Sequence, residues 1–257
     1  MTATDPSPAA RHQPLPAAPG ARDRVEGQVW EALGRVMDPE LDEPITSLGF
    51  VHEWGVSAGV ARVRLRLPTF FCAANFAWLM VSDARDAVLS VEGVTEAEVH
   101  LDDHFASNEI NAGVQRNEGF VGAFAGEAEQ ELDGLRLAFR RKAYQAALER
   151  VCRRLRREGT SIEGLGELVL EEVPASADLD RLLRRRADIG LPCGESSSLA
   201  LDEQGRRVCP GDLPAWLRRA QTVRVNIEGN TELCRGLLRT RYHLDDLEAE
   251  LSGRDRT

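Results

Sequence analysis

Two short runs of alternating residues constrain the fold of this chain most. In residues 60–67 apolar side chains alternate with arginines, which is the two-residue period of a strand with one face in water. Residues 50–56 form a second run with strand character, and Ser57-Ala58-Gly59 between the two runs is typical of a hairpin turn. The sequence therefore predicts an antiparallel hairpin near the start of the chain.

Helical patterns lie on both sides of this hairpin. Residues 24–37 and 75–91 repeat apolar side chains every three or four positions. Asp38-Pro39 ends the first helix, because the residue before a proline avoids the helical region. Residues 94–101 favour a third strand, so the predicted order is helix, strand, strand, helix, strand.

This order predicts a fold of the α/β (α+β) class, with a small α-β-β-α-β domain over residues 23–105. Residues 106–250 are expected to form a larger, mixed and helix-rich extension, whose longest helix covers 132–158. Residues 1–22 are rich in proline and alanine without periodicity, which predicts a disordered tail. The other expected elements of the extension are helices at 107–117, 177–187 and 230–240, a helix opened by Asp212 with Pro214, strands at 165–173 and 222–228, and a hairpin formed by 198–202 and 206–209.

Charge and composition exclude several classes of protein. With 32 basic and 42 acidic residues the net charge is −10, which argues against nucleic-acid binding. No apolar run approaches the ~20 residues of a membrane helix, and the start of the chain lacks the pattern of a secretory signal. Five cysteines at irregular spacing do not indicate a disulfide framework, so we expect a cytoplasmic protein.

Motifs of the common enzyme classes are absent from the sequence. There is no phosphate-binding loop, dinucleotide fingerprint, Gly-x-Ser-x-Gly elbow or His-Glu-x-x-His helix. Kinase, dehydrogenase and hydrolase activities therefore lack support, and a carrier or assembly factor is favoured over an enzyme.

Cys72 is the first candidate for a chemical role. It follows Thr69 in the short loop between the strand at 60–67 and the helix at 75–91. A helix N-terminus offers free N–H groups and partial positive charge, and both favour the thiolate that binds metal or sulfur. The alternative is a buried cysteine that acts as a small apolar filler.

Several different short motifs occur in this first domain. They are Asp38-Pro39-Glu40, Leu48-Gly49, the hairpin, Thr69 with Cys72, and Glu92-Gly93-Val94. In this combination residues 24–102 resemble the iron–sulfur cluster assembly domain family, which contains the SufT and PaaD proteins. The resemblance implies a small α/β protein that assembles or delivers metal–sulfur clusters, with Cys72 as the reactive residue and Asp38 and Glu40 as motif residues. The chain departs from the family pattern at Phe71 and Ala73, where a glycine or proline is usual beside the cysteine.

The expected cofactor is iron or an iron–sulfur cluster held transiently, with zinc as a further option. One thiolate cannot hold a cluster that needs about four ligands, so a second chain or a client protein must complete the site. This predicts a homodimer or a transient bridge to a client metalloprotein. The long form of the chain resembles proteins encoded beside bacterial multicomponent di-iron monooxygenases, which suggests a di-iron hydroxylase subunit as the client.

A second group of candidate metal ligands follows the third strand. It consists of His100, Asp102, Asp103, His104 and Glu109. If the strand continues, His100, Asp102 and His104 share one face and form the two-histidine, one-carboxylate set of a non-haem iron site. The alternative is a polar strand end followed by a helix cap at Ser107.

The remaining cysteines give weaker signals. Cys234 is expected in the first turn of a helix capped by Thr231, which is either a thiolate site or simple packing. Cys193 and Cys209 flank the expected hairpin, but their spacing is not that of a zinc knuckle. Cys152 lies within the long helix and is expected to be structural.

Asp38 and Glu40 also admit two interpretations. Asp-Pro sequences end helices and form turns, which is a purely structural role. Alternatively, both carboxylates and Thr69 lie near Cys72 and tune its sulfur. Carboxylates disfavour a nearby thiolate, so the second interpretation requires a bound cation.

Three functional hypotheses follow from these patterns. The first is a metal–sulfur cluster assembly or metal-delivery factor that uses Cys72 as its transfer ligand and its extension to recognise the client. The second is a metal-free assembly chaperone or adaptor for an oxygenase subunit. The third is a metal-dependent enzyme built on the cluster from His100 to His104.

Overall fold

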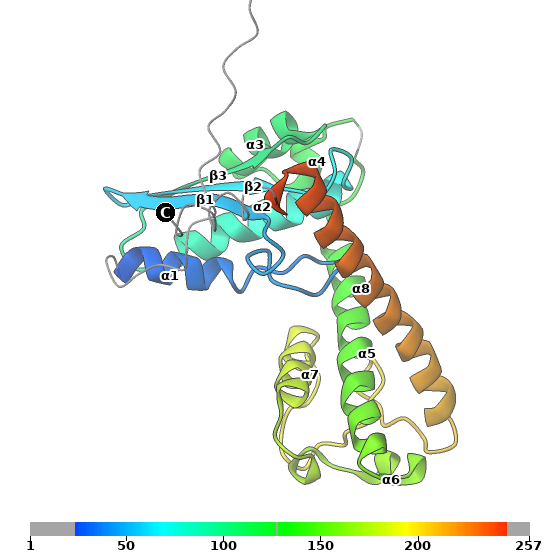
Figure 1. Ribbon diagram of the computed structural model, residues 1–257. Coiled ribbons are helices and arrows are strands. Elements are labelled where there is room, and N and C mark those ends of the chain that lie inside the picture. The colour runs from blue at the N-terminus through cyan, green and yellow to red at the C-terminus, as the bar shows by residue number, and fades with distance from the viewer. Residues whose placement is uncertain (1–23, 127, 246–257) are drawn as a thin grey trace, which may run out of the picture.

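The computed structural model describes residues 24–126 and 128–245, so the tail expected at 1–22 lies outside the described residues. Figure 1 shows two lobes joined by two long helices. The first lobe contains a three-stranded sheet and the second is built from helices and loops.

The first lobe has the predicted helix–strand–strand–helix–strand order. Helix α1 (Arg24–Leu33) precedes β1 (Val51–Ser57) and β2 (Val60–Arg66), which pair antiparallel. Ala58 and Gly59 connect them with φ values of 52° and 80°, the two left-handed residues of a tight hairpin turn. Helix α2 (Ala74–Leu89) then crosses to β3 (Glu96–Asp102), which lies parallel to β2 and gives the strand order β1-β2-β3.

The two faces of the sheet have different environments. Helices α1 and α2 lie on one face, where alternate residues of β2 and β3 are buried (Figure 1). On the other face Arg62 pairs with Glu98 at 2.8 Å and Arg64 pairs with Asp102 at 2.7 Å. The alternation predicted from the sequence is therefore confirmed.

The rest of the chain is predominantly helical. The elements are α3 (Ser107–Gln115), α4 (Phe120–Ala123), α5 (Asp133–Arg157), α6 (Ile162–Glu167), the 3-10 turn η1 (Leu170–Glu172), α7 (Ala177–Asp188) and α8 (Leu213–Arg241). Ile110 and Val114 of α3 belong to the core of the first lobe, whereas α5, α6 and α7 build the second lobe. The mixed α/β class with a helix-rich C-terminal part is confirmed. None of the helices in the described residues has the length and apolarity needed to cross a membrane.

Two strands predicted in the second lobe are wrong. Residues 165–173 contain the end of α6 and the turn η1, and only Val169 forms an isolated bridge, to Ser198. Residues 222–228 lie inside α8. The expected hairpin is reduced to one isolated bridge, between Leu201 and Arg207.

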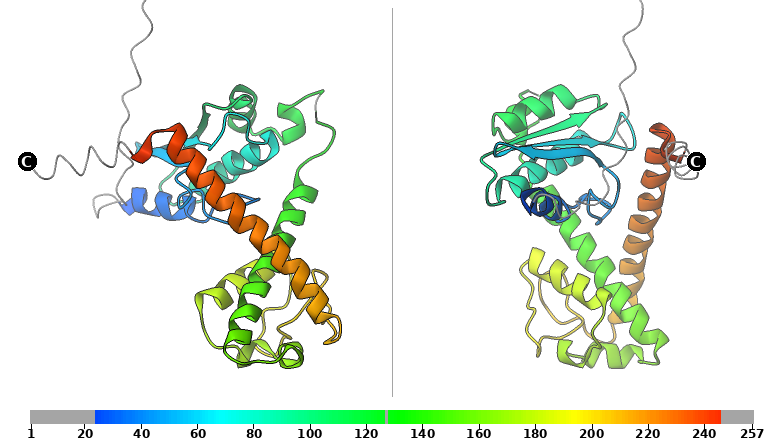
Figure 2. Two further views of the ribbon diagram at one scale, coloured as in Figure 1. Left: turned by 45° about the vertical axis from the view of Figure 1, so that its right-hand side comes forward. Right: turned by 60° about the vertical axis from the view of Figure 1, so that its left-hand side comes forward.

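Helix α8 contributes to both hydrophobic cores. Leu213 and Trp216 near its start are buried in the core of the second lobe, whereas Leu238 near its end and the adjacent Tyr242 are buried in the core of the first. Its 29 residues span about 43 Å at the usual rise of a helix. Both views of Figure 2 show it as one unbroken helix running from one lobe to the other.

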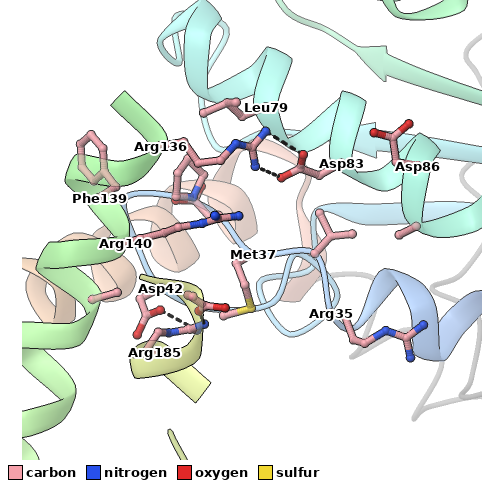
Figure 3. Close-up of a pocket in the computed structure, with 16 residues that line it drawn as sticks. Arg35, Met37, Asp42, Leu79, Asp83, Asp86, Arg136, Phe139, Arg140 and Arg185 are labelled. Atoms are coloured by element: carbon pink, nitrogen blue, oxygen red, sulfur yellow. Dashed lines mark hydrogen bonds and ion pairs between the residues drawn. The ribbon is translucent and has the colours of Figure 1, made fainter. Parts of the chain in front are cut away.

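Charged side chains connect the lobes beside a pocket. Arg185 of α7 pairs with the buried Asp42 at 2.6 Å, and Arg136 of α5 pairs with Asp83 of α2 (Figure 3). Between these pairs lies a cavity of about 330 Å³, with Phe139 on its wall. The two pairs fix α5 and α7 against the first lobe.

Candidate functional site

Cys72 lies in the loop that leads from β2 into α2. Its side chain is half-buried, and the hydroxyl of Thr69 is 3.4 Å from its sulfur. The N-cap residue of α2, Ala73, makes no side-chain capping bond. The sulfur is thus placed near the positive end of a 16-residue helix, as the sequence predicts.

His104 holds the Cys72 loop in place. Its Nε2 donates a 2.7 Å hydrogen bond to the carbonyl oxygen of Cys72, and its Nδ1 accepts a 3.2 Å bond from the N–H of Ala106. A ring nitrogen that accepts from an amide carries no proton, which fixes the proton on Nε2. Burial lowers the pKa of His104, so the imidazole is neutral.

This geometry gives His104 a positioning role. Both ring nitrogens are bonded to backbone groups, so a metal could bind either nitrogen only by displacing one of these hydrogen bonds. A third bond, from the N–H of Phe105 to the carbonyl of Phe70, fixes the same two segments together. The backbone of the Cys72 loop is therefore held by the turn that follows β3.

The other candidate ligands near His104 do not converge with it. Strand β3 ends at Asp102, and Asp103 adopts a φ of 48°, which interrupts the alternation on which the shared face depended. His100 and Glu109 are exposed, whereas His104 is buried. In the described ranges no three histidine, cysteine or acidic side chains form a group that could hold a metal ion.

Asp38 builds the turn between α1 and the hairpin. Its carboxylate accepts 2.8 Å hydrogen bonds from the N–H groups of Glu40 and Leu41. Burial raises the pKa of Asp38 to about 6; these backbone bonds lower it, and the Glu40 carboxylate raises it. The turn interpretation thus has a structural basis, and the same turn presents Glu40 to α8.

Helix α8 makes direct contact with this turn. Nδ2 of Asn230 donates a 3.3 Å hydrogen bond to Glu40 Oε1. One helical turn later is Cys234, whose pKa burial raises to about 11, with further increases from the charges of Asp38, Cys72 and Glu40. Cys234 is therefore near enough for the charge of Cys72, which is 162 positions earlier in the chain, to raise its pKa.

The local environment predicted for Cys234 is wrong, because it is not in a first helical turn. Cys234 and Thr231 lie deep within α8, and the Thr231 hydroxyl donates to the carbonyl of Ile227 instead of capping a helix. Cys209 precedes the start of α8, about 30 Å of helix away from Cys234. Cys152 is buried, and burial raises its pKa to about 12, in line with a structural role.

The end of α8 and the residue after it lie against the Cys72 loop. The guanidinium of Arg241 donates to the carbonyl oxygens of Leu67, at 3.0 Å, and Asp103, at 2.7 Å. The ring of Tyr242 lies under the guanidinium of Arg66, 4.6 Å from its centroid. Sequence reasoning missed this docking because it divided α8 into a first helix opened by Asp212 and Pro214, a strand and a second helix.

An aromatic patch lies on the surface beside Cys72. We define it as Phe70, Phe71 and Phe105, which are 45%, 78% and 51% exposed. Their ring centroids lie 5.0 to 6.5 Å apart, so the three rings form one exposed apolar surface. The adjacent phenylalanines in the Cys72 loop are the sequence signal for this patch.

Comparison with known proteins agrees with the geometry of the first lobe. Residues 26–99 match the family described as iron-sulfur cluster assembly protein. The match extends from α1 into β3 and includes the Asp38 turn and Cys72, but neither His104 nor α8. No curated protein is detectably similar to the chain. Residues 26–99, less than half of the chain, are therefore similar to the iron–sulfur cluster assembly protein family.

Proposed function

We propose that this protein delivers iron or an iron–sulfur cluster to a client metalloprotein, with Cys72 as the transfer ligand. The family match to residues 26–99 supports a general role in cluster assembly or maturation. The proposal adds the direction of transfer, the ligand and the client. The cargo is a substrate that passes through the protein and is not a resident cofactor.

The placement of Cys72 carries this proposal. Its sulfur is half-buried at the start of α2, while hydrogen bonds from His104 and Phe105 fix the backbone around it. A fixed, partly accessible thiol can bind a soft metal and still release it to a competing ligand. Thiolates are the usual ligands of iron–sulfur clusters, so the chemistry suits the cargo.

The aromatic patch beside Cys72 supports contact with a client at this point. Exposed aromatic rings are enriched at protein interfaces, and Phe71 is the most exposed large apolar side chain among the described residues. We infer that the client covers the patch and receives the cargo from Cys72. The resemblance of the long form to proteins encoded beside di-iron monooxygenases supports a hydroxylase subunit as this client.

The decisive experiment is reconstitution of an apo-hydroxylase. The wild-type protein, purified anaerobically with its iron and sulfide measured, is expected to restore hydroxylase activity in proportion to the metal it carries. Cys72→Ser is expected to remain folded but to lose both the bound metal and the restored activity. Cys209→Ser, which changes an exposed cysteine of the second lobe, is the matched control.

The same assay distinguishes the rival hypothesis of a metal-free chaperone. In that case Cys72→Ser would activate the client as well as the wild type does, when free iron is supplied to both. Normal activation by Cys72→Ser with no metal on either protein would overturn delivery through this residue.

A further inference from the structure

The side of α8 that carries Cys234 is defined by contacts before and after it. Asn230, one turn earlier, bonds to Glu40. Leu238, one turn later, packs so closely on Gly49 that a Cβ added there would lie 3.2 Å from its Cδ2. Residues four apart share one face of a helix, so Cys234 faces the first lobe between these two contacts.

Cys72 lies in the loop between β2 and α2, within the same lobe that Cys234 faces. Both cysteines are half-buried and pack against the core of the first lobe. Arg241, two turns beyond Cys234, bonds to the carbonyl of Leu67 just before the Cys72 loop. Helix α8 therefore runs past the Asp38 turn and then over the Cys72 loop, with Cys234 between the two.

We propose that Cys234 is a second ligand for the iron cargo, so that Cys72 and Cys234 hold the same iron atom through two thiolates. This inference rests on the proposed function and deepens it, because it adds a residue that lies outside the matched domain. It also makes α8 part of the cargo site and not only a structural support.

The chemistry of two thiolates suits transfer better than storage. Soft sulfur ligands select iron, zinc and iron–sulfur clusters over magnesium or calcium. Two thiolates fill only two of the about four positions of such a metal, and among residues 24–126 and 128–245 no third ligand joins them in a metal-binding group. The remaining positions are open to ligands of the client, which can then take the iron.

Binding of Fe²⁺ by this pair is balanced without a redox step. Each thiol loses its proton to solvent, and each sulfur donates an electron pair to the iron, so one Fe²⁺ releases two protons. Transfer to a client reverses the process, because the two thiolates are protonated again as client ligands replace them. No oxidant or reductant is required.

Titration with Co²⁺ as a probe of Fe²⁺ tests this inference directly. The charge-transfer absorption from thiolate to Co²⁺ increases with the number of bound thiolates. Wild-type protein is expected to show the intensity of two thiolates, and Cys234→Ser about half of it, with an affinity for Co²⁺ lower by about tenfold or more. Cys209→Ser is the control and should match the wild type.

The outcomes separate this inference from the proposed function. If Cys234→Ser binds Co²⁺ as the wild type does while Cys72→Ser loses binding, the second ligand is excluded and delivery through Cys72 stands. If neither variant changes the absorption, both ideas fail. A loss of signal in Cys209→Ser would place the metal elsewhere and overturn the inference.

A metal-free measurement checks that the two thiols meet. Dibromobimane becomes strongly fluorescent only when two nearby thiols each displace one of its bromides. Reduced wild-type protein is expected to form one fluorescent cross-link that is lost equally in Cys72→Ser and Cys234→Ser. Fluorescence that persists in Cys234→Ser would show that the cross-link joins other thiols and that Cys72 and Cys234 do not form a pair. This conclusion does not depend on metal binding by the variant.

Discussion

His104 and Cys72 lie 32 positions apart, and Nε2 of the imidazole donates a 2.7 Å hydrogen bond to the cysteine's carbonyl oxygen. This bond joins the segment after β3 to the loop before α2. The backbone of the reactive cysteine therefore depends on a histidine that sequence patterns place among metal ligands.

Removing this histidine should loosen the Cys72 loop. His104→Ala leaves the Cys72 carbonyl and the Ala106 N–H without partners, which should lower the free energy of unfolding by about 1–3 kcal/mol. The thiol of Cys72 should also react faster with a disulfide reagent. Urea unfolding and thiol kinetics measure the two effects.

His100→Ala is the matched control for this experiment. His100 is exposed on the outer face of the sheet, so its loss should change stability by no more than about 0.5 kcal/mol. Equal effects of the two alanine variants would show that the bonds of His104 contribute nothing to the loop.

Asp38 should make the stability depend on pH in a specific direction. Because burial raises its pKa from 3.8 to about 6, the folded state takes up a proton before the unfolded state does as the pH falls. The charged form disfavours folding above pH about 6, and this penalty decreases as the pH falls towards 4. Lowering the pH from 7.5 to 5 should therefore gain about 1.4 kcal/mol from Asp38 alone.

Comparison with Asp38→Asn isolates this contribution. The asparagine keeps an oxygen acceptor for the N–H groups of Glu40 and Leu41 but does not titrate. Denaturant unfolding of both proteins should be measured across the pH range. As the pH falls, the free energy of unfolding of the wild type should increase relative to that of the variant. A constant difference between them would mean that the carboxyl is not perturbed by burial.

Gly49 should tolerate no side chain. Its φ is +75°, a region that costs other residues about 1–2 kcal/mol, and an added Cβ would lie 3.2 Å from Leu238 Cδ2. Gly49→Ala should therefore lower the midpoint of thermal unfolding and displace the end of α8. The control is Gly229→Ala within α8, where an added Cβ meets nothing within 4 Å and should stabilise the helix by up to about 1 kcal/mol.

The aromatic patch should matter for client contact and not for folding. Phe71 is 78% exposed, so Phe71→Ser should change stability by no more than about 0.5 kcal/mol. The same variant should bind less of a fluorescent apolar dye and should need a higher concentration to activate an apo-hydroxylase. Val225→Ser, a change of an exposed apolar residue on α8 that lies outside the patch, should leave both measurements unaltered.

The sequence predicted the first lobe well because each of its elements has a strong local signal. The alternation in residues 60–67, the turn at Gly59 and the helical spacing in residues 75–91 depend only on near neighbours. The position of Cys72 before a helix could be predicted for the same reason. The family resemblance added the motif around Asp38, which the match to residues 26–99 supports.

Helix α8 was harder to predict because its local signals conflict. Val223, Val225 and Ile227 alternate with polar residues and so mimic a strand. The helical pattern appears only over a longer window, in which Ala220, Arg224, Ile227, Thr231, Cys234 and Leu238 recur every three or four residues as buried or half-buried positions. Only Ile227 and Leu238 among these six are strongly apolar, so the repeat is hard to recognise.

The pairing of Cys234 with the first lobe could not be predicted from sequence alone. It depends on a helix that starts in one core and ends in another, and on the contacts of Asn230 and Leu238 with residues more than 180 positions earlier. A repeat of three and four residues indicates which side of a helix is buried, but not which surface covers it.

The two ends of α8 make the lobes interdependent. Shortening the chain to its matched domain would strip Leu238 and Tyr242 from the hydrophobic interior around Phe50 and leave apolar side chains facing water. Unfolding of either lobe would remove the packing contacts of one end of α8 and so destabilise the other lobe. Heat or denaturant should therefore unfold the described residues in one cooperative transition. An excised domain should consequently be less stable and more prone to aggregation than the intact chain.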